Sequence, residues 1–279
     1  MVESHSKTWL ITGVSSGLGK ALAEEVIRSG SQVVGTFRNA EQALLFEKTF
    51  PGKAKGLLLD LNDSDSIKSV VAKAWGTFGS IDVVVNNAGY GLIGAIEEIT
   101  ADEIRSQMET NFFGALFVTQ ECLPHFRKKG FGTIVQISSQ AGFNAAAGFG
   151  AYNASKFALE GFSEALSLET KHLGIRVIIV EPGPFRTKWA GNSTISNADA
   201  IEDYAPTSGM VRGRIHSSKG MQPGDPVKAA QVIIHAVNSE KPPLRLVLGR
   251  IALESVRSKL KQVEQDLIDW ESQTLSADY

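Results

Sequence analysis

Short apolar runs alternate with amphipathic stretches along most of this 279-residue chain. Runs such as Val83-Val84-Val85 and Val177-Ile178-Ile179-Val180 do not alternate polar with apolar residues, which is typical of strands covered on both faces in a parallel sheet. The apolar runs predict strands at residues 8–11, 32–37, 54–59, 81–85, 132–138, 176–182 and 245–248.

The stretches between these runs carry helix signals. Asp63 can cap a helix whose apolar positions, from Ile67 to Ala74, recur with helical spacing. Thr100 and Glu103 form a capping box that opens a helix running to about residue 129. Because strands and helices alternate, the sequence predicts an α/β fold: a Rossmann-type, doubly wound parallel sheet with flanking helices. Sheets of this kind commonly run to about 250 residues as one domain, so we expect residues 1–279 to form a single domain.

The first predicted strand runs directly into a glycine-rich turn, Thr12-Gly13-x-x-x-Gly17-x-Gly19. The apolar residues that follow have helical spacing, so the glycines lie between a strand and a helix. Small residues let the backbone approach a pyrophosphate, and the unpaired N–H groups at the helix start face the anion. The turn therefore predicts a dinucleotide site; the alternative is that the glycines only permit tight packing.

Tyr152 and Lys156 are four residues apart in a predicted helix. Residues at this spacing share a helix face, with their β-carbons about 5–6 Å apart. A nearby ammonium favours the phenolate, which lowers the pKa of a tyrosine toward the range where it exchanges protons at neutral pH. The pair therefore predicts proton-transfer chemistry; the alternative is a lysine stem that merely covers the ring.

Small and polar residues follow three further predicted strands. They are Asn86-Asn87-Ala88-Gly89, Ser138-Ser139, and the run from Pro182 to Thr187. Because ligands of doubly wound sheets bind beyond the carboxyl ends of the strands, we expect these segments to open on one rim.

In these motifs the chain resembles the short-chain dehydrogenase/reductase family. The glycine turn, the run Asn86-Asn87-Ala88-Gly89, and Ser139 placed thirteen residues before Tyr152-x-x-x-Lys156 match the family pattern in order and spacing, over about residues 7 to 190. The resemblance implies an oxidoreductase that transfers a hydride between a nicotinamide cofactor and a carbonyl or secondary alcohol. The segments Tyr90-Gly91-Leu92 and Pro242-Pro243-Leu244-Arg245-Leu246 resemble the hydroxysteroid and retinol dehydrogenase-like branch of the family.

The resemblance also implies roles for four residues. Tyr152 would give or take the proton at the substrate oxygen, Ser139 would hydrogen-bond that oxygen, and Lys156 would lower the pKa of the tyrosine and bind the nicotinamide ribose. Asn111 matches the position that holds a water linked to the lysine; the alternative is a polar side chain satisfied by backbone. Spacing to Tyr152 selects Ser139 over Ser138, which we expect to be structural or to face the cofactor. Because the set is complete, we favour an enzyme over a non-catalytic NAD(P)-sensing regulator with the same fold.

The end of the second strand bears on the choice of cofactor. NAD-preferring relatives carry an acidic residue there, whereas this chain has Arg38, whose guanidinium suits the extra phosphate of NADP. We therefore expect NADP, with NAD as the alternative and with an ordinary solvated arginine as the alternative role of Arg38. Asp60 and Leu61 match the adenine-contacting pair of the family, although Asp60 is equally suited to begin a turn. The predicted cofactor site comprises Gly13, Ser15, Ser16, Gly17, Leu18, Gly19, Arg38, Asp60, Leu61, Asn87, Ala88, Gly89, Tyr152, Lys156, Pro182, Gly183, Phe185 and Thr187.

Charge and composition disfavour other classes of protein. With 28 Lys and Arg against 30 Asp and Glu, the net charge is −2, so there is no electrostatic footprint for nucleic acid or an anionic membrane. The N-terminal residues lack an apolar signal core and no stretch approaches the length of a membrane span, so we expect a cytoplasmic protein. The single Cys122 excludes an internal disulfide, and the five histidines lack metal-ligand spacing, so we expect no metal site.

Residues 190–224 are rich in Gly, Ser and Asn and lack clear periodicity, and the resemblance places a variable substrate lid there. Candidate pocket residues on the same rim are mostly aromatic or apolar, which favours a bulky, uncharged carbonyl or alcohol. The alternative is that these residues pack the lid. They are Tyr90, Leu92, Phe143, Asn144, Phe149, Phe185 and Trp189.

An apolar stripe marks the C-terminal region and predicts an amphipathic helix over residues 251–275. The stripe is shorter than the three or four heptads typical of a coiled coil, so we expect the helix to dock on its own domain, with a dimer contact as the alternative. Homodimers and homotetramers are common in the family that the chain resembles, and we expect one of them here. The stripe consists of Leu253, Val256, Leu260, Val263, Leu267 and Trp270.

Overall fold

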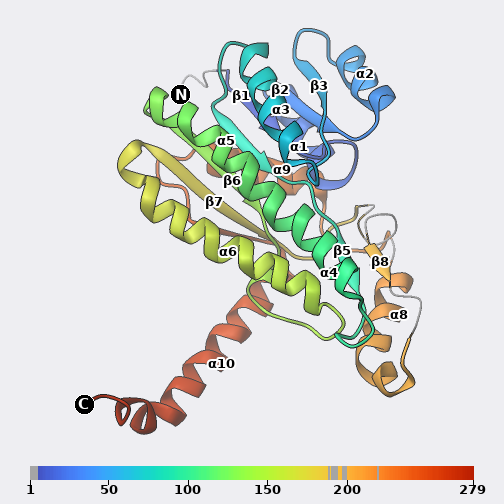
Figure 1. Cartoon of the computed structure of the whole chain (residues 1–279), viewed down its shortest axis with the longest axis vertical. Coiled ribbons are helices and arrows are strands. Elements are labelled where there is room, and N and C mark those ends of the chain that lie inside the picture. The colour runs from blue at the N-terminus through green and yellow to red at the C-terminus, as the bar shows by residue number, and fades with distance from the viewer. Residues whose placement is uncertain (1–5, 188, 190–193, 197–199, 219) are drawn as a thin grey trace.

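The computed structural model describes residues 6–187, 189, 194–196, 200–218 and 220–279. Seven strands form one parallel sheet: β1 (Thr8–Ile11), β2 (Gln32–Phe37), β3 (Ala54–Leu58), β4 (Val83–Asn86), β6 (Gly132–Ile137), β7 (Ile175–Pro182) and β9 (Arg245–Leu248). Their order across the sheet is β3-β2-β1-β4-β6-β7-β9 (Figure 1). The order reverses between β1 and β4, which confirms the predicted doubly wound sheet.

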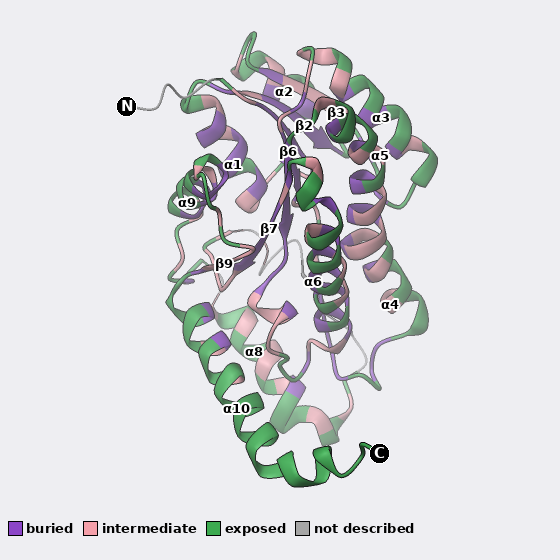
Figure 2. Ribbon diagram, turned by 90° about the vertical axis from the view of Figure 1, so that its left-hand side faces the viewer, coloured by how far each residue is buried: buried purple, intermediate pink, exposed green. Residues whose placement is uncertain are grey.

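Helices cover both faces of this sheet: α1 (Gly17–Arg28), α2 (Ala40–Thr49), α3 (Ser64–Thr77), α5 (Gly114–Lys129), α6 (Gly150–Thr170) and α9 (Pro226–Asn238). Helices α1, α2 and α9 pack on one face through residues such as Leu22 and Ile233 (Figure 2). Helices α3, α5 and α6 pack on the other face through residues such as Ile67 and Val118. The strands are therefore buried from both sides, which is why their sequences read as continuous apolar runs.

The predicted capping box opens a long helical segment. The Thr100 hydroxyl accepts from the Glu103 amide at 3.3 Å, and the Glu103 carboxylate accepts from the Thr100 amide at 2.9 Å. The segment consists of α4 (Ala101–Met108), the π-helical turn η1 (Glu109–Phe113) and α5, and it ends at Gly130, whose φ is +76°. π-Helical turns inside α-helices are frequent at functional sites, and this one contains Asn111.

The segment after β7 contains elements that the sequence pattern does not predict. Strand β8 (Thr194–Ser196) pairs with β5 (Gly91–Ile93) in a parallel two-stranded sheet, and α8 (Met210–Ser217) follows. Of the lid predicted at residues 190–224, residues 190–193, 197–199 and 219 lie outside the described residues.

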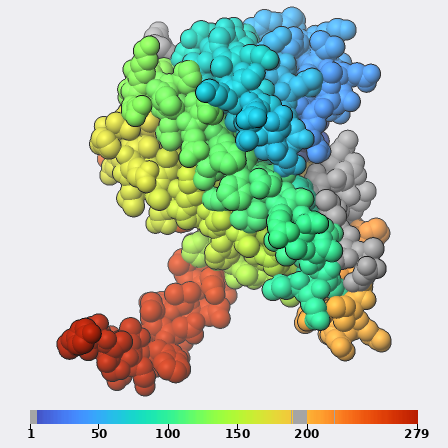
Figure 3. All heavy atoms as spheres, viewed as in Figure 1, coloured from blue at the N-terminus to red at the C-terminus, as the bar shows by residue number. Residues whose placement is uncertain are grey.

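The last helix, α10 (Arg250–Leu275), projects from the rest of the chain (Figures 1 and 3). Ala252 and Val256 in its first turns are buried, whereas every residue from Leu260 onward is exposed. The expectation that this helix docks on its own domain is therefore wrong beyond Val256. The physical reason is the length of the helix. Its first turns pack on the domain, but its apolar stripe continues beyond the edge of that surface.

Candidate active site

The turn after β1 has the geometry that its glycines predict. Gly13 and Gly17 adopt φ values of +69° and +62°, a region that glycine reaches without steric cost. A Cβ on Gly13 would lie 2.9 Å from the Cβ of Ala88, so the turn packs directly against the loop after β4. Ser16 is the N-cap of α1, and its side chain makes no capping hydrogen bond within the described chain. The backbone donors at the start of α1 are therefore available to an anion.

Thr12 and Asn87 lock the loops after β1 and β4 together. The Thr12 hydroxyl accepts from the amides of Asn87 and Ala88 at 2.9 and 3.1 Å. The Asn87 side-chain amide donates to the carbonyls of Thr12 and Gly13 at 2.9 and 3.0 Å. A Cβ on Gly19 would clash with this same amide group. Asn87, predicted to contact a cofactor, thus also braces the glycine turn.

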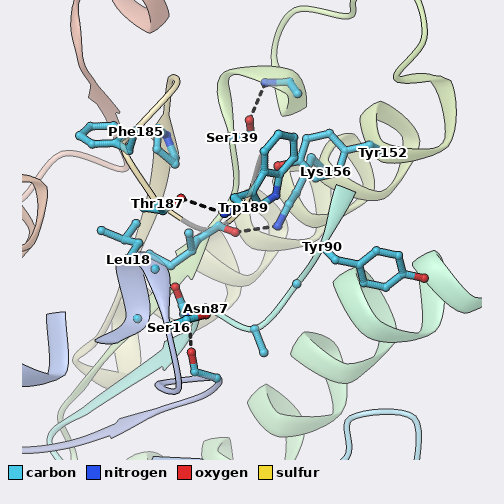
Figure 4. Close-up of a pocket in the computed structure, with 18 of the residues that line it drawn as sticks. Ser16, Leu18, Asn87, Tyr90, Ser139, Tyr152, Lys156, Phe185, Thr187 and Trp189 are labelled. Atoms are coloured by element: carbon cyan, nitrogen blue, oxygen red, sulfur yellow. Dashed lines mark hydrogen bonds between the residues drawn. The ribbon is translucent and has the colours of Figure 1, made fainter. Parts of the chain in front are cut away.

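One cavity of about 1200 Å³ extends along the carboxyl ends of the strands. All of the predicted cofactor residues line it, from Gly13 in the turn to Thr187 after β7. Ser139, Tyr152 and Lys156 line it too (Figure 4). The cavity also involves residues that the sequence analysis does not single out at the ends of β2, β3 and β6. They are Thr36, Phe37, Asn39, Gln42, Leu59, Asn62, Ile137 and Gln140.

Tyr152 is 7% exposed, and its ring packs against the rings of Phe149 and Trp189, whose centroids are 6.0 and 5.6 Å away. Burial raises the pKa of Tyr152 to about 12, and interaction with the Ser139 hydroxyl opposes this rise. The expectation that Lys156 brings this pKa down toward neutrality is wrong for these groups as they stand. Burial has the largest influence on this pKa, because the charged phenolate is the form that the loss of hydration destabilises.

The Lys156 ammonium is buried beside the tyrosine. Its Nζ lies 5.9 Å from the centroid of the Tyr152 ring and donates a hydrogen bond to the Ile137 carbonyl at 2.8 Å. Burial lowers the pKa of Lys156 to about 8, while the carboxylate of Glu160 acts in the opposite direction. The lysine is therefore held at the end of β6, where its charge responds to pH near neutrality.

The two adjacent serines have different surroundings. Ser139 caps a short 3₁₀ turn, with its hydroxyl accepting from the Ala141 amide at 3.1 Å, and it is the serine that interacts with the phenol of Tyr152. Ser138 donates its backbone N–H to Val180 on β7 at 2.8 Å, and its hydroxyl lies against Glu160. The spacing argument therefore selects the serine that adjoins Tyr152.

Asn111 does not line the cavity but lies directly behind it. Its side chain accepts from the Tyr90 amide at 3.0 Å and donates to the Tyr90 carbonyl and the Ser155 hydroxyl at 2.9 and 3.0 Å. A Cβ on Gly89 would lie 3.0 Å from the Asn111 side-chain oxygen and 3.7 Å from Lys156 Nζ. Asn111 thus connects the loop after β4 to α6 beside the lysine. Its hydrogen bonds to the Tyr90 backbone are of the kind expected for the alternative role, a polar side chain satisfied by backbone groups.

A cluster of charged side chains, in which Glu160 and Glu181 are buried, adjoins Lys156 through Glu160. Arg245 on β9 places its Nε 3.3 Å from Glu160 and 3.5 Å from Glu181, and its Nη2 lies 3.0 Å from Glu164. Burial raises the pKa of Glu181 to about 7, and the charge of Glu160 adds to this effect. Sequence reasoning missed this cluster, because Glu160 and Glu164 lie on α6 whereas Glu181 and Arg245 come from β7 and β9, and no spacing links these three elements.

The predicted pocket residues divide between the cavity and the core. Tyr90, Asn144, Phe149, Phe185 and Trp189 line the cavity, although the ring of Tyr90 points away from Lys156 (Figure 4). Leu92 instead packs in a core cluster with Ile99 and Ala151, and Phe143 is not part of the cavity wall. The described part of the lid contributes residues with no sequence signal: Val211, Arg214, Ile215, Ser218, Met221, Gln222 and Pro223.

Glu98 fastens the described part of the lid to the turn after β5. Its carboxylate accepts from the amides of Ala95 and Ile201 at 2.6 and 2.9 Å and pairs with Arg212 of α8 at 2.7 Å. The Ala95 amide is the largest of several contacts that hold the pKa of Glu98 below its ordinary value. The side chain is 1% exposed, so this carboxylate depends on its protein partners rather than on water.

Two further properties concern the described residues only. None of the helices in this part of the chain is long and apolar enough to cross a membrane. The same residues contain no group of three or more His, Cys, Asp or Glu side chains placed to hold a metal ion.

Comparison with known proteins identifies the class of protein that this fold and site define. A family model described as short chain dehydrogenase matches residues 7–197. A 3-ketodihydrosphingosine reductase from Bacteroides thetaiotaomicron is 38% identical, over 86% of this chain and 87% of that protein. An NADPH-dependent 3-dehydrocapnine reductase from Ornithobacterium rhinotracheale is 32% identical, over 86% of this chain and 87% of that protein. The crystal structure of a short-chain dehydrogenase from Streptomyces avermitilis matches with a TM-score of 0.93 at 40% identity, covering 99% of this chain and 100% of that one.

The chain therefore belongs to the short-chain dehydrogenase family and is a dehydrogenase or reductase. Solved structures with the same fold include complexes with NAD and with NADP. Both named relatives are reductases, which supports an enzyme over the non-catalytic regulator.

Proposed function

We propose that this protein is an NADP-dependent oxidoreductase that transfers a hydride between nicotinamide and a carbonyl or secondary alcohol of a bulky, largely apolar substrate. The observation that carries the proposal is the presence of Tyr152, Ser139 and Lys156 in one cavity with the glycine turn of β1. A dinucleotide fits this cavity for two reasons. The turn has glycines where it packs most closely against the loop after β4, and the start of α1 presents backbone N–H donors to the cavity.

When bound, the nicotinamide supplies the hydride. The role of this chain is to handle the proton and the charge at the substrate oxygen. A Tyr152 phenol with a pKa raised to about 12 is protonated at neutral pH and suited to donate its proton to a carbonyl oxygen. Ser139, beside the phenol, is placed to donate a hydrogen bond to that oxygen as negative charge develops on it.

Lys156 would supply positive charge next to both groups. With a pKa lowered to about 8, it carries its charge at neutral pH and loses it in mildly alkaline solution. That charge stabilises the phenolate left after proton donation, which the buried surroundings of Tyr152 otherwise disfavour. Asn111, fixed to Tyr90 and Ser155, would position the loop and helix on either side of the lysine.

The choice of NADP rests on the end of β2. Arg38 follows the last residue of this strand and lines the cavity, together with Asn39 and Gln42. An exposed guanidinium can bind a phosphate through two parallel hydrogen bonds. The name of the NADPH-dependent 3-dehydrocapnine reductase supports the same cofactor.

The cofactor assignment is tested by comparing rates with NADPH and NADH in the wild type and in Arg38→Ala. We expect the wild type to prefer NADPH and the variant to lose about tenfold of that preference, in line with the loss of one charge-assisted contact of about 1.5 kcal/mol. Arg105→Ala is the matched control, since Arg105 is exposed on α4 and pairs with Asp102. A wild type that prefers NADH, unchanged by Arg38→Ala, would contradict the assignment.

The substrate class rests on the wall of the cavity opposite the glycine turn. Phe149, Tyr152 and Trp189 form an aromatic group there, with the rings of Phe149 and Trp189 stacked at 6.3 Å. Val211, Ile215 and Met221 of the lid segment add apolar surface. Both named relatives are reductases of a 3-keto or 3-dehydro compound, which supports a ketone as the group that is reduced.

The mechanism is tested with a panel of bulky ketones followed by NADPH absorbance. Tyr152→Phe keeps the ring and removes the hydroxyl, so we expect kcat to fall about 10²- to 10⁴-fold while NADPH affinity stays within twofold. Tyr204→Phe is the matched control, because its hydroxyl donates to Glu97 and it does not line the cavity. Undiminished turnover by Tyr152→Phe would refute the assignment of the proton donor.

A further inference from the structure

The outer part of α10 carries an apolar face that is open to solvent. The side chains of Leu260, Val263, Leu267 and Trp270 are 53%, 42%, 65% and 65% exposed. At 100° per residue these positions continue the helix face on which Ala252 and Val256 are buried. The helix thus begins against the body and then carries the same face away from it (Figures 1 and 3).

The charges along α10 are divided in the same direction. Arg257, Lys259 and Lys261 make its first free turns basic, and a run of acidic residues from Glu264 to Glu271 follows. The acidic residues are Glu264, Asp266, Asp269 and Glu271. An antiparallel pair of such helices sets each basic half against an acidic half, whereas a parallel pair sets like charges side by side at the acidic end.

We propose that α10 pairs with α10 of a second copy of this chain, antiparallel and about a two-fold axis. Residues 257–275 provide a free segment of about 28 Å at 1.5 Å per residue. In a two-fold symmetric contact the apolar faces of the two α10 helices bury each other. Antiparallel pairing keeps the remainders of the two chains at opposite ends of the helix pair. The body of the same chain cannot cover this face, because the helix leaves it after Val256.

The charge distribution favours a second copy over a lipid surface. Amphipathic helices that lie on membranes typically carry lysine and arginine along their polar face. Here the half that bears Leu267 and Trp270 is flanked by acidic residues, which anionic lipid headgroups repel.

Single engineered cysteines test the arrangement in the full-length protein. Cys122 is buried, and burial raises the pKa of its thiol, so it does not compete for the reagent. Val263→Cys lies near the middle of the stripe, and we expect a short bis-maleimide to link it to itself across the axis. Thr274→Cys, near the end of the helix, should not link, and Ser258→Cys, on the opposite helix face, is the matched control.

Charge reversal then tests the partner. In the Val263→Cys background, Arg257→Glu with Lys259→Glu leaves residues 257–271 with six acidic residues and one basic residue, and Glu264→Lys with Asp266→Lys leaves them with five basic and two acidic residues. Each variant alone should lose at least fivefold in cross-linked fraction, and an equal mixture of the two should recover it. NADPH-dependent activity should stay unchanged in all of them, because these positions lie outside the cavity.

Several results would overturn the proposal. Absence of cross-linking at Val263→Cys rejects pairing of the tails, even if the protein dimerises through another surface. Equal cross-linking at Thr274→Cys indicates parallel helices. Insensitivity to charge reversal rejects the complementary halves, and binding of an uncross-linked protein to phosphatidylcholine vesicles assigns the apolar face to a lipid surface instead.

Discussion

The attachment of the lid through Glu98 leads to a quantitative prediction for Glu98→Gln. The carboxylate uses one oxygen for the Ala95 amide and Arg212 and the other for the Ile201 amide. An amide has a single acceptor oxygen, so its NH₂ group must face either the Ile201 N–H or the donors of Ala95 and Arg212. The substitution therefore loses at least one hydrogen bond to a charged group, worth about 2–3 kcal/mol, in a site with almost no access to water.

That loss should appear as faster opening of the lid segment. A change of about 2–3 kcal/mol corresponds to about 30- to 150-fold faster amide exchange at Ile201 and in α8, measured by hydrogen exchange and mass spectrometry. The KM for a bulky ketone should rise, because residues of α8 line the cavity, whereas NADPH affinity should change little. The same loosening should occur in the wild type at acidic pH. The pKa of Glu98 in the folded protein lies below its ordinary value, so the ionised carboxylate stabilises the fold fully when the pH is above that ordinary pKa. This stabilisation is lost as the pH falls through the lower pKa of the folded state.

Glu97→Gln is the matched control for this experiment. Glu97 is the preceding residue, and its exposed carboxylate accepts a hydrogen bond from the Tyr204 hydroxyl at 2.7 Å. We expect exchange within about threefold of the wild type in this variant, as is usual for an exposed pair. If Glu98→Gln exchanges at the wild-type rate, the carboxylate does not hold the lid and the reasoning fails.

Three further predictions concern the rest of the site. Gly19→Ala forces a Cβ into the Asn87 amide, so NADPH affinity should fall at least about tenfold by fluorescence titration and stability by about 1–3 kcal/mol; unchanged binding would contradict the bracing role of Asn87. Glu181, with a pKa raised to about 7, keeps its proton in the folded state while the unfolded chain releases it, so stability should decline as the pH rises from about 5 to 7. Glu181→Gln should flatten that part of the stability profile in urea melts, and a profile as steep as that of the wild type would argue against this titration. Asn111→Ala leaves the Tyr90 amide without its acceptor and removes one of the donors to the Tyr90 carbonyl and a donor to the Ser155 hydroxyl, so it should cost about 1–3 kcal/mol in the same melts, whereas a loss below about 0.5 kcal/mol would show that water replaces the side chain.

The main sheet could be predicted because the apolar runs in the sequence coincide with strands that are covered on both faces in the fold. Val83, Val84 and Val85 are fully buried between two helical layers, so an unbroken apolar run is what such a strand requires. The small sheet of β5 and β8 could not be predicted in this way. Its two strands have three residues each and lie about a hundred residues apart, so only the folded chain brings them together.

The sequence predicted which side chains lie close together where that depends on short spacings, and it missed neighbours that come from distant segments. Four-residue spacing on α6 correctly placed Lys156 beside Tyr152. It could not show that both are buried, and burial determines the direction in which each pKa moves. The docking of α10 was wrong for a similar reason, since a hydrophobic pattern shows which face is apolar but not where the surface beneath it ends.

The cluster of Glu160, Glu181 and Arg245 has a consequence for exchanging parts between relatives. The family model ends at residue 197, yet the guanidinium that pairs with two buried acids, one of them Glu160 beside Lys156, comes from β9, almost fifty positions later. A chimera joined between these points, with a donor segment that lacks an arginine at this register, would bury two carboxylates without a counter-charge. Lys156, the lysine proposed to act in catalysis, would then titrate in a more negative field, so segment swaps in this enzyme should carry β9 together with α6.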